Sequence, residues 1–241
     1  SAVAIYTVPY DLAAKLWVIP AALIAALFPL LAQKIFSDAK IAERIFFDTA
    51  YFLLILIFPL IIFSIGASEI GLRAWLGEEI SAQSAPILKT ILIGVFINSF
   101  ALLPFTLLHS AGRPAVTAIV HVVELPIYIF ALIYCLGEFG VLGGAFAWLG
   151  RIVIDFAVLV YFSVRYFPSF LVSWMQVCKW VAAAFFTSLL IALLEDGRLK
   201  LYALVAVALV YSGLTICWLK RLVGRNRCAD LNSHLGRFPL K

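Results

Sequence analysis

Long apolar runs alternate with short polar stretches along almost the whole sequence. Each run is long enough to cross a bilayer as a helix, which takes about 17–25 mostly apolar residues. The pattern predicts about seven transmembrane helices, near residues 8–33, 47–68, 87–109, 116–137, 141–164, 177–194 and 201–219. We therefore expect an all-α, polytopic transmembrane helical bundle, with almost no residues left for a soluble domain.

The composition agrees with this pattern. Of the 241 residues, 65% are hydrophobic and 13% are charged, and the mean hydropathy is +1.09, whereas soluble domains carry about 25% charged residues. The four cysteines lie far apart, so the sequence predicts no metal centre and no cofactor. It also lacks the GxxxxGK[ST] loop of nucleotide-binding proteins and the HExxH and GxSxG signatures of hydrolases. Any transport is therefore expected to be driven by a gradient or to run downhill.

The basic residues indicate how the chain is oriented. The loops after the predicted first, third and fifth helices, together with the tail, hold twelve of the eighteen Lys and Arg residues, and the opposite loops hold four. Because positive charge favours the cytoplasmic side, we expect a cytoplasmic tail and an external Ser1. A basic tail beside a membrane helix is typical of contact with anionic membrane lipids, so we expect no nucleic-acid partner.

Four ionisable residues interrupt the fourth and fifth apolar runs. His121 and Glu124 lie in the first of these runs, and Arg151 and Asp155 lie in the second. A charge at the bilayer centre costs about 2.5–3.5 kcal/mol on the insertion scale, so an ionisable residue inside a membrane helix indicates a function by default. Since only the short turn at 136–140 separates the two runs, we expect an antiparallel helical hairpin.

The spacing of these residues from the turn predicts that they meet. Counted from Phe139, Glu124 lies fifteen residues back, Asp155 sixteen residues forward and Arg151 twelve residues forward. With about 1.5 Å of rise per residue, Glu124 and Asp155 should lie at nearly the same depth, and Arg151 about one turn nearer the hairpin. Each pair also shares one helix face, because its members are three or four residues apart. We expect a polar seam buried between the helices.

Two interpretations of the seam remain open. It either fixes the packing of the two helices as a buried ion cluster, or it lines a cavity that binds an ion or a polar head group. Buried ion pairs are weak evidence for stability. Two carboxylates facing one guanidinium also leave the seam with an excess negative charge unless His121 is protonated or the acids share a proton. A metal is not expected, because Asp155 is the only third ligand available beside His121 and Glu124.

Three further residues are candidates for contact with a transported molecule. Asp11 and Lys15 form an i,i+4 pair near the outer end of the first helix, where they either make an interfacial ion pair or line the mouth of a cavity. Arg113 lies in the tight turn at 109–114. It is either an orienting charge of the cytoplasmic side or a phosphate contact at the cytoplasmic opening.

Small residues predict close packing at two places. Glycines at the hairpin allow the two helix backbones to approach closely, at Gly140, Gly143 and Gly144. The third predicted helix carries a small and polar stripe that is typical either of helix packing or of cavity lining, with Thr90, Gly94 and Asn98 spaced four residues apart.

The seam residues lie in two stretches that resemble a known family. These stretches are His121-Val-Val-Glu124-Leu-Pro-Ile-Tyr and the segment from Gly140 to Asp155, which ends in Arg-Ile-Val-Ile-Asp. They resemble the Wzx-type polysaccharide (O-antigen and exopolysaccharide) repeat-unit flippases of the MOP exporter superfamily. Weaker matches occur at 6–11, 28–29, 75–79 and 110–114. The resemblance covers roughly residues 1–165, while 177–219 matches only as two apolar spans.

The resemblance implies an architecture for the chain. The family has two six-helix lobes around a central cavity, sometimes followed by two extra helices, and works by alternating access. On this plan residues 1–165 are a partial C-terminal transporter lobe of five helices, 166–221 are two additional helices, and 222–241 form a basic cytoplasmic tail. The chain would then correspond to the eighth to fourteenth helices, and the N-terminal lobe of the same protein would be missing. The lack of an initiating Met, together with an external Ser1, favours the same expectation.

The resemblance also implies a cargo, a place and site residues. The cargo of the family is an undecaprenyl-pyrophosphate-linked oligosaccharide, carried across the bacterial cytoplasmic (inner) membrane for surface polysaccharide synthesis without covalent chemistry. Arg151 and Arg113 would contact phosphate, while His121, Glu124 and Asp155 would neutralise charge or relay protons. One alternative is a cation- or proton-coupled multidrug antiporter of the same superfamily. Another is a membrane-embedded glycosyl- or acyltransferase that uses His121 or Glu124 as a base.

Overall fold

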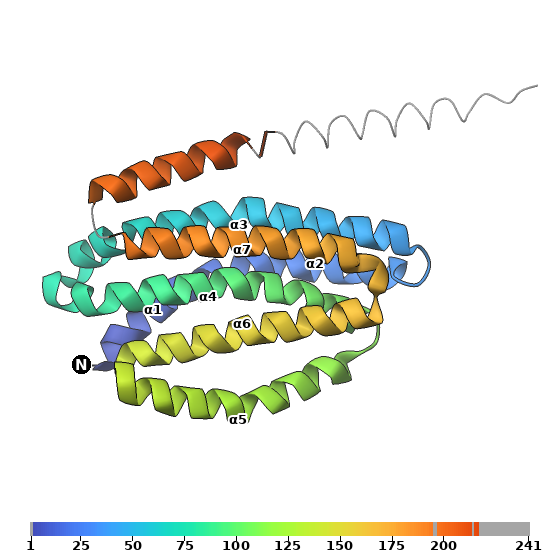
Figure 1. Cartoon of the computed structure of the whole chain (residues 1–241), viewed down its shortest axis with the longest axis horizontal. Helices are drawn as coiled ribbons and strands as arrows, with labels where there is room; N and C mark the ends of the chain where they lie inside the picture. Colours follow the sequence, from blue (N-terminus) through green and yellow to red (C-terminus); the bar gives the residue numbers. More distant parts are fainter. Residues whose placement is uncertain (1, 195–196, 214, 217–241) are drawn as a thin grey trace, which may run out of the picture. The chain divides into compact units, whose positions relative to one another are not determined.

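A computed structural model describes residues 2–194, 197–213 and 215–216, and nearly all of these residues are helical (Figure 1). Six of the described segments, with α1 and α2 taken as one, are long and apolar enough to cross a membrane. The predicted all-helical membrane bundle is therefore confirmed. The helices of the compact unit formed by residues 1–195 are α1 (Ala2–Leu16), α2 (Val18–Lys34), α3 (Ala39–Leu76), α4 (Glu78–Ser110), α5 (Pro114–Phe139), α6 (Val141–Tyr166) and α7 (Leu171–Leu193), with a 3-10 turn, η1 (Pro168–Phe170), before α7.

The central helix of this unit is α4, which runs between α6 and the pair formed by α3 and α7 (Figure 1). Most of its side chains are buried, and the rings of Phe96 and Phe100 are fully buried and pack on each other. α5, in contrast, packs mainly on α6. Most of the apolar side chains of α5 are consequently exposed.

The first predicted helix is broken at Trp17 into α1 and α2. Pro20 explains the break, because its nitrogen carries no hydrogen to donate to the carbonyl of Leu16. At the break, the Trp17 N–H donates to the carbonyl of Ala14, which is three residues back and not four as in a regular α-helix. The break gives α1 a course of its own along α4.

The predicted cytoplasmic link at 34–46 is mostly helical, because α3 begins at Ala39. Asp38 starts the helix, since its side chain accepts a hydrogen bond from the Ile41 N–H and so caps the first turn. Lys, Arg and Glu are good helix formers wherever their side chains reach water. Polarity alone therefore gave a wrong boundary for this helix.

The polar residues at 71–79, between the predicted helices at 47–68 and 87–109, indicated an outer loop, and this expectation is also wrong. α3 continues to Leu76 and α4 begins at Glu78, so Gly77 is the single residue between two long helices. Its φ of +81° lies in the region that favours glycine. Arg73 and Glu78 form an ion pair of 3.0 Å across this turn.

We counted Lys89 among the four basic residues of the outer loops, although the predicted helix at 87–109 includes it. Lys89 lies inside α4. Its ammonium group pairs with Glu69 of α3 and donates a hydrogen bond to the carbonyl oxygen of Ala192 in α7. The Lys89 side chain is only 12% exposed. This contact joins three helices and fixes the end of α7 to the centre of the unit.

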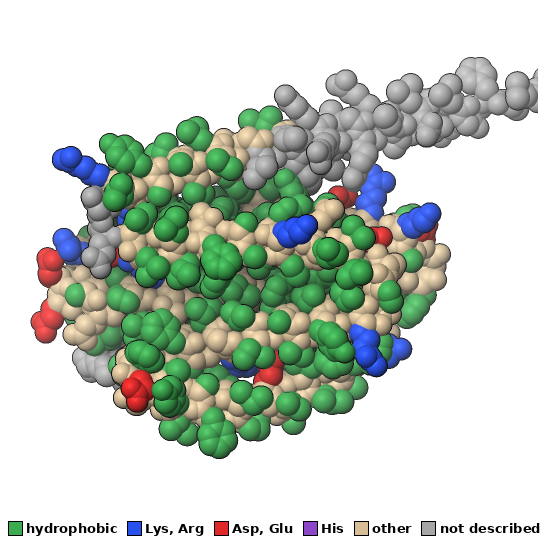
Figure 2. All heavy atoms as spheres, in the orientation of Figure 1, with side chains coloured by type: hydrophobic (Ala, Val, Ile, Leu, Met, Phe, Trp, Pro, Cys, Tyr) green, Lys and Arg blue, Asp and Glu red, His purple; other side chains and the backbone are tan. Residues whose placement is uncertain are grey.

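The surface of the helices matches a membrane environment. Figure 2 shows a mainly hydrophobic face over the unit, with most charged side chains near the helix ends. This distribution is typical of transmembrane helices, because charged side chains are costly at the depth of the hydrocarbon. The chain is an integral membrane protein.

The described residues from 197 onward belong to a second unit, in which 197–213 are helical. The predicted seventh helix at 201–219 therefore lies partly outside the described residues, and the predicted tail at 222–241 lies wholly outside them. The division of the chain at 165 and 221 stays a prediction.

Candidate functional site

α5 and α6 form the predicted antiparallel hairpin, with Gly140 as the single residue between them. The φ of Gly140 is +58°, which favours glycine. Gly143 faces the backbone carbonyl of Cys135 so closely that a Cβ atom would overlap it. The close approach predicted for the hairpin glycines is therefore confirmed at Gly143, and it sets the register of the two helices.

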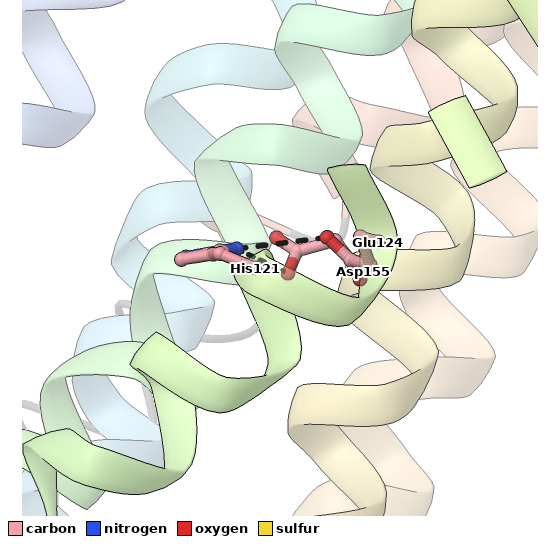
Figure 3. Close-up of side chains that lie close together, drawn as sticks. All are labelled: His121, Glu124 and Asp155. Atoms are coloured by element: carbon pink, nitrogen blue, oxygen red, sulfur yellow. Dashed lines mark ion pairs between the residues drawn. The ribbon is translucent and has the colours of Figure 1, made fainter. Parts of the chain in front are cut away.

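The four ionisable residues of the hairpin meet near the middle of the two helices, and we call them the charged cluster. His121 Nδ1 lies 3.5 Å from Glu124 Oε2 and 3.5 Å from Asp155 Oδ1 (Figure 3). Arg151 Nε lies 3.9 Å from Glu124 Oε2. The sequence prediction that these residues of the two helices meet is confirmed.

Both carboxylates of the charged cluster are buried with few partners. Glu124 and Asp155 are each 6% exposed, and Glu124 Oε1, Glu124 Oε2 and Asp155 Oδ1 accept no hydrogen bond within the described structure. Leaving charged groups buried without hydrogen bonds is costly. Such an arrangement is more typical of a site completed by a ligand or a proton than of a structural clamp.

Arg151 also has unused hydrogen-bonding capacity. Its guanidinium group lies 5.6 Å from the centre of the Tyr128 ring, and its one ion pair, to Glu124, involves Nε. A guanidinium group carries five N–H donors arranged for bidentate binding of phosphate or carboxylate. Arg151 is therefore well placed to bind an anionic group.

The charged cluster borders a cavity of about 390 Å³ between α1, α4, α5 and α6, which we call the main cavity. This volume lies in the usual range of small-molecule sites, about 300–1,000 Å³. Its walls combine aromatic rings with polar groups, from Tyr10, Trp17, Phe105, Trp148, Asn98, His121, Arg151 and Asp155. The cavity thus offers both stacking surfaces and hydrogen-bonding groups.

The small and polar stripe of α4 serves both purposes that the sequence left open. Thr90 donates to the carbonyl of Pro86 within its own helix, and Gly94 lies directly against the indole of Trp148. Asn98 lines the main cavity. Gly94 is therefore a packing position, while Asn98 is a cavity position.

The Gly94→Ala variant is expected to lose stability, because its Cβ would overlap the six-membered ring of Trp148 and force the indole to shift within the wall of the main cavity. Overpacking of this kind costs about 1–3 kcal/mol. Thermal unfolding of the purified protein measures the loss.

A second substitution tests the cause. The Gly94→Ala/Trp148→Phe variant removes the overlapping ring and should recover stability relative to Gly94→Ala. Gly71→Ala is the matched control, because nothing lies within 4 Å of a Cβ at Gly71. Equal stability of Gly94→Ala and Gly71→Ala would contradict the role given to Trp148.

The three weaker candidates do not line the main cavity. Asp11 and Lys15 are exposed on α1, and the described structure contains no ion pair between them. Arg113 lies at the open end of the hairpin, where its guanidinium group is 4.1 Å from the centre of the Tyr166 ring. The roles of these three residues in transport stay predictions.

A stack of rings next to the charged cluster was missed by the sequence analysis. Phe105 of α4 stacks on His109, with ring centroids 4.0 Å apart, and lies 6.5 Å from the ring of His121. His109 Nε2 is 2.7 Å from Thr117 Oγ1. The spacing of four residues between Phe105 and His109 is the only signal in the sequence, and a phenylalanine in an apolar helix looks like ordinary core.

The charged cluster contains the one group of possible metal ligands found among the described residues. Ligand atoms of His121, Glu124 and Asp155 lie within 4.8 Å of one another. The Arg151 guanidinium, 3.9 Å from Glu124, disfavours a further cation there by charge repulsion. The expectation of no metal and no cofactor stays a prediction.

Comparison with known proteins identifies one informative relative. The chain is 32% identical over 163 residues to a Shigella flexneri protein named "Putative O-antigen transporter", and the match covers 68% of this chain and 38% of the relative. The chain thus spans less than half of the length of that relative. No family model matches the sequence, and no solved structure matches it.

Proposed function

Since the chain belongs to the family of Wzx-type O-antigen flippases, we propose that it forms part of a transporter for undecaprenyl-pyrophosphate-linked oligosaccharide repeat units. The transporter would act in the bacterial cytoplasmic membrane, with the C-terminal tail in the cytoplasm, and would supply surface polysaccharide synthesis. The complete transporter would contain an N-terminal lobe that closes the main cavity from the other side. No covalent chemistry is required.

The observation that carries this proposal is the position of Arg151 in the wall of the main cavity. A guanidinium group with unused donors, at the depth of the hydrocarbon, is costly unless it serves a function. It matches the diphosphate of the proposed cargo, because guanidinium and phosphate groups form strong bidentate hydrogen bonds.

The rest of the cavity suits the sugar part of the cargo. Aromatic rings of Trp17 and Trp148 supply flat apolar faces, and Asn98 and Asp155 supply hydrogen-bonding groups for hydroxyls. Glu124 and Asp155 would keep Arg151 from holding the diphosphate too tightly, because they compete for the same cation. Release of the cargo on the far side of the membrane then requires less free energy.

A second function is favoured by the excess of acids in the charged cluster. Two carboxylates face one guanidinium group, which would also suit an antiporter that exchanges a cationic solute for a proton or sodium ion. In that case Arg151 would regulate the acids instead of binding cargo. The experiment below separates the two functions.

The test is deletion of the complete gene from the source organism. We expect lipid-linked repeat units to accumulate and surface polysaccharide to disappear, and the complete gene should reverse both. The Arg151→Ala version should restore transport about 10- to 100-fold less well, since a hydrogen bond to a charged group contributes about 1.5–3 kcal/mol. Lipid extraction and quantification of surface glycan provide the measurements.

Arg165→Ala is the matched control, because Arg165 lies on the same helix but is exposed, and among the described residues its side chain donates a hydrogen bond to the Tyr161 hydroxyl alone, at 3.4 Å. It should complement fully. Arg151→Lys should rescue in part, since it keeps the charge but not the fork of donors. Normal surface glycan without accumulated intermediate in the deletion strain would favour the antiporter, and a drug-sensitivity screen would follow.

A further inference from the structure

Arg151 borders a second cavity as well as the main one. This groove, about 200 Å³ in volume, lies along the seam between α5 and α6. Arg151 and Glu124 are its only charged residues. The charged cluster therefore separates an aromatic and polar cavity from an apolar one.

The groove runs along the hairpin from the charged cluster toward the turn at Gly140. On α5 it follows Ile127, Ala131 and Cys135, which are four residues apart and therefore on one helix face. On α6 it follows three residues with the same spacing, Ile154, Gly150 and Phe146. These eight-residue paths run from the charged cluster toward the turn at Gly140 over about 12 Å.

We propose that this groove binds the isoprenoid chain of the lipid-linked substrate, starting next to the diphosphate held by Arg151. The site rests on the proposed function, since it assigns a place to one part of the same cargo. The cargo joins glycan, diphosphate and isoprenoid chain in that order. Arg151 lines both the main cavity and the groove, so the diphosphate bound there would have a place for the glycan on one side and for the isoprenoid chain on the other.

The small side chains of the groove make room for this chain. Gly150 leaves open space, as no atom lies within 4 Å of the position of a Cβ, and Ala131 is only partly exposed across from it. Ile127, Phe146 and Ile154 supply apolar surface. Since lipid tails are as apolar as these side chains, close packing and not exclusion of water would hold the chain in the groove.

The depth of the groove favours this occupant over a membrane phospholipid. Arg151 is the eleventh of the 26 residues of α6, so the charged end of the groove lies near the middle of the span. A phospholipid keeps its phosphate at the interface, roughly half of the 30 Å hydrocarbon thickness away. An acyl chain of a phospholipid can reach the groove, but only a lipid whose diphosphate has entered the protein also places its anionic group at Arg151.

The experiment uses the purified full-length transporter in phosphatidylcholine nanodiscs with a benzophenone-bearing polyprenyl diphosphate as probe. We expect photolabelling of α5 and α6 peptides that contain Ala131 and Gly150. The groove-filling variants Gly150→Phe and Ala131→Trp should each reduce this labelling about tenfold, which corresponds to about 1.4 kcal/mol. Ala118→Trp is the matched control, because Ala118 is exposed on α5 outside the groove, and it should label normally.

A native thiol gives an independent measurement on the unaltered groove. Cys135 lines the groove, while Cys178 lies on α7. With Cys217 and Cys228 replaced by serine, polyprenyl diphosphate should slow alkylation of Cys135 by N-ethylmaleimide and leave Cys178 unaffected. Inorganic diphosphate alone should not protect Cys135, because it lacks the chain.

Several results would overturn the proposal. They are equal labelling of the groove-filled variants, equal protection of Cys135 and Cys178, or displacement of the probe by a phosphatidylcholine analogue with the same efficiency, which would make the groove an ordinary lipid contact. Absence of all labelling in α5 and α6 would indicate that another protein segment covers the groove. Each of these outcomes leaves the accumulation of lipid-linked repeat units in the deletion strain untouched, so the two proposals fail separately.

Discussion

The Gly143→Ala substitution is expected to leave only a small fraction of the protein correctly folded. Its Cβ would overlap the carbonyl oxygen and carbon of Cys135, and both atoms belong to the backbone of α5, which cannot move aside like a flexible side chain. Overpacking costs about 1–3 kcal/mol, and we expect a value at the upper end. The two helices would have to separate at the hairpin, which would also displace Glu124 from Arg151.

The neighbouring glycine provides the control. A Cβ at Gly144 meets only side-chain atoms of Tyr6 and Leu136, at 3.6 Å and 3.7 Å, so Gly144→Ala should fold normally. Size-exclusion chromatography and thermal unfolding of both purified variants make the comparison. If Gly143→Ala were as stable as Gly144→Ala, the close contact at Cys135 would not set the register of the hairpin.

The second large effect is expected from Arg151→Met. The substitution leaves Glu124 and Asp155 buried beside His121 alone. Breaking a buried ion pair by removing one partner costs about 3–5 kcal/mol, because the remaining charge is uncompensated. We therefore expect a marked loss of thermal stability, measured on the purified full-length protein, in addition to the loss of transport.

Neutralising the acids as well separates the two roles of the cluster. In the Arg151→Met/Glu124→Gln/Asp155→Asn variant, the charged cluster no longer contains a carboxylate without its guanidinium partner. The stability of this variant should therefore return close to that of the unsubstituted protein. Transport should stay about 10- to 100-fold reduced, because the guanidinium group proposed to bind the diphosphate is still missing. If stability and transport returned together, Arg151 would act only as a structural partner of the acids, and its proposed contact with cargo would be wrong.

The hairpin and its cluster could be predicted from the sequence because both depend on local geometry. Equal distances from one turn fix equal depths on two antiparallel helices, and residues three or four apart must share a face. For these reasons the sequence could predict that Glu124 and Asp155 lie close together. The short turn at 136–140 reduced the possible arrangements to one.

Other features could not be predicted because they depend on water or on distant helices. α3 and α4 extend past their apolar spans, since charged residues such as Arg44 and Glu69 remain helical beyond the hydrocarbon. Lys89 was assigned to a loop by its charge, and only the positions of Glu69 and the Ala192 carbonyl explain its burial. The main cavity also requires α1 to lie along α4, which no local pattern in the sequence indicates. The break at Trp17 was not predicted either, because Pro20 looks no different in the sequence from Pro29 and Pro59, which lie inside continuous helices.

The length of the α3–α4 hairpin has a practical consequence for imaging. With 38 residues, α3 is about 57 Å long, nearly twice the hydrocarbon thickness of about 30 Å. Its last turn and the first turn of α4 meet at Gly77, where nearly all residues from 73 to 80 are exposed. Proteins confined to a detergent micelle offer few features for particle alignment in electron cryo-microscopy. An antibody fragment raised against this tight helical corner, or a small domain joined rigidly to it, would supply such a feature at a distance from the main cavity.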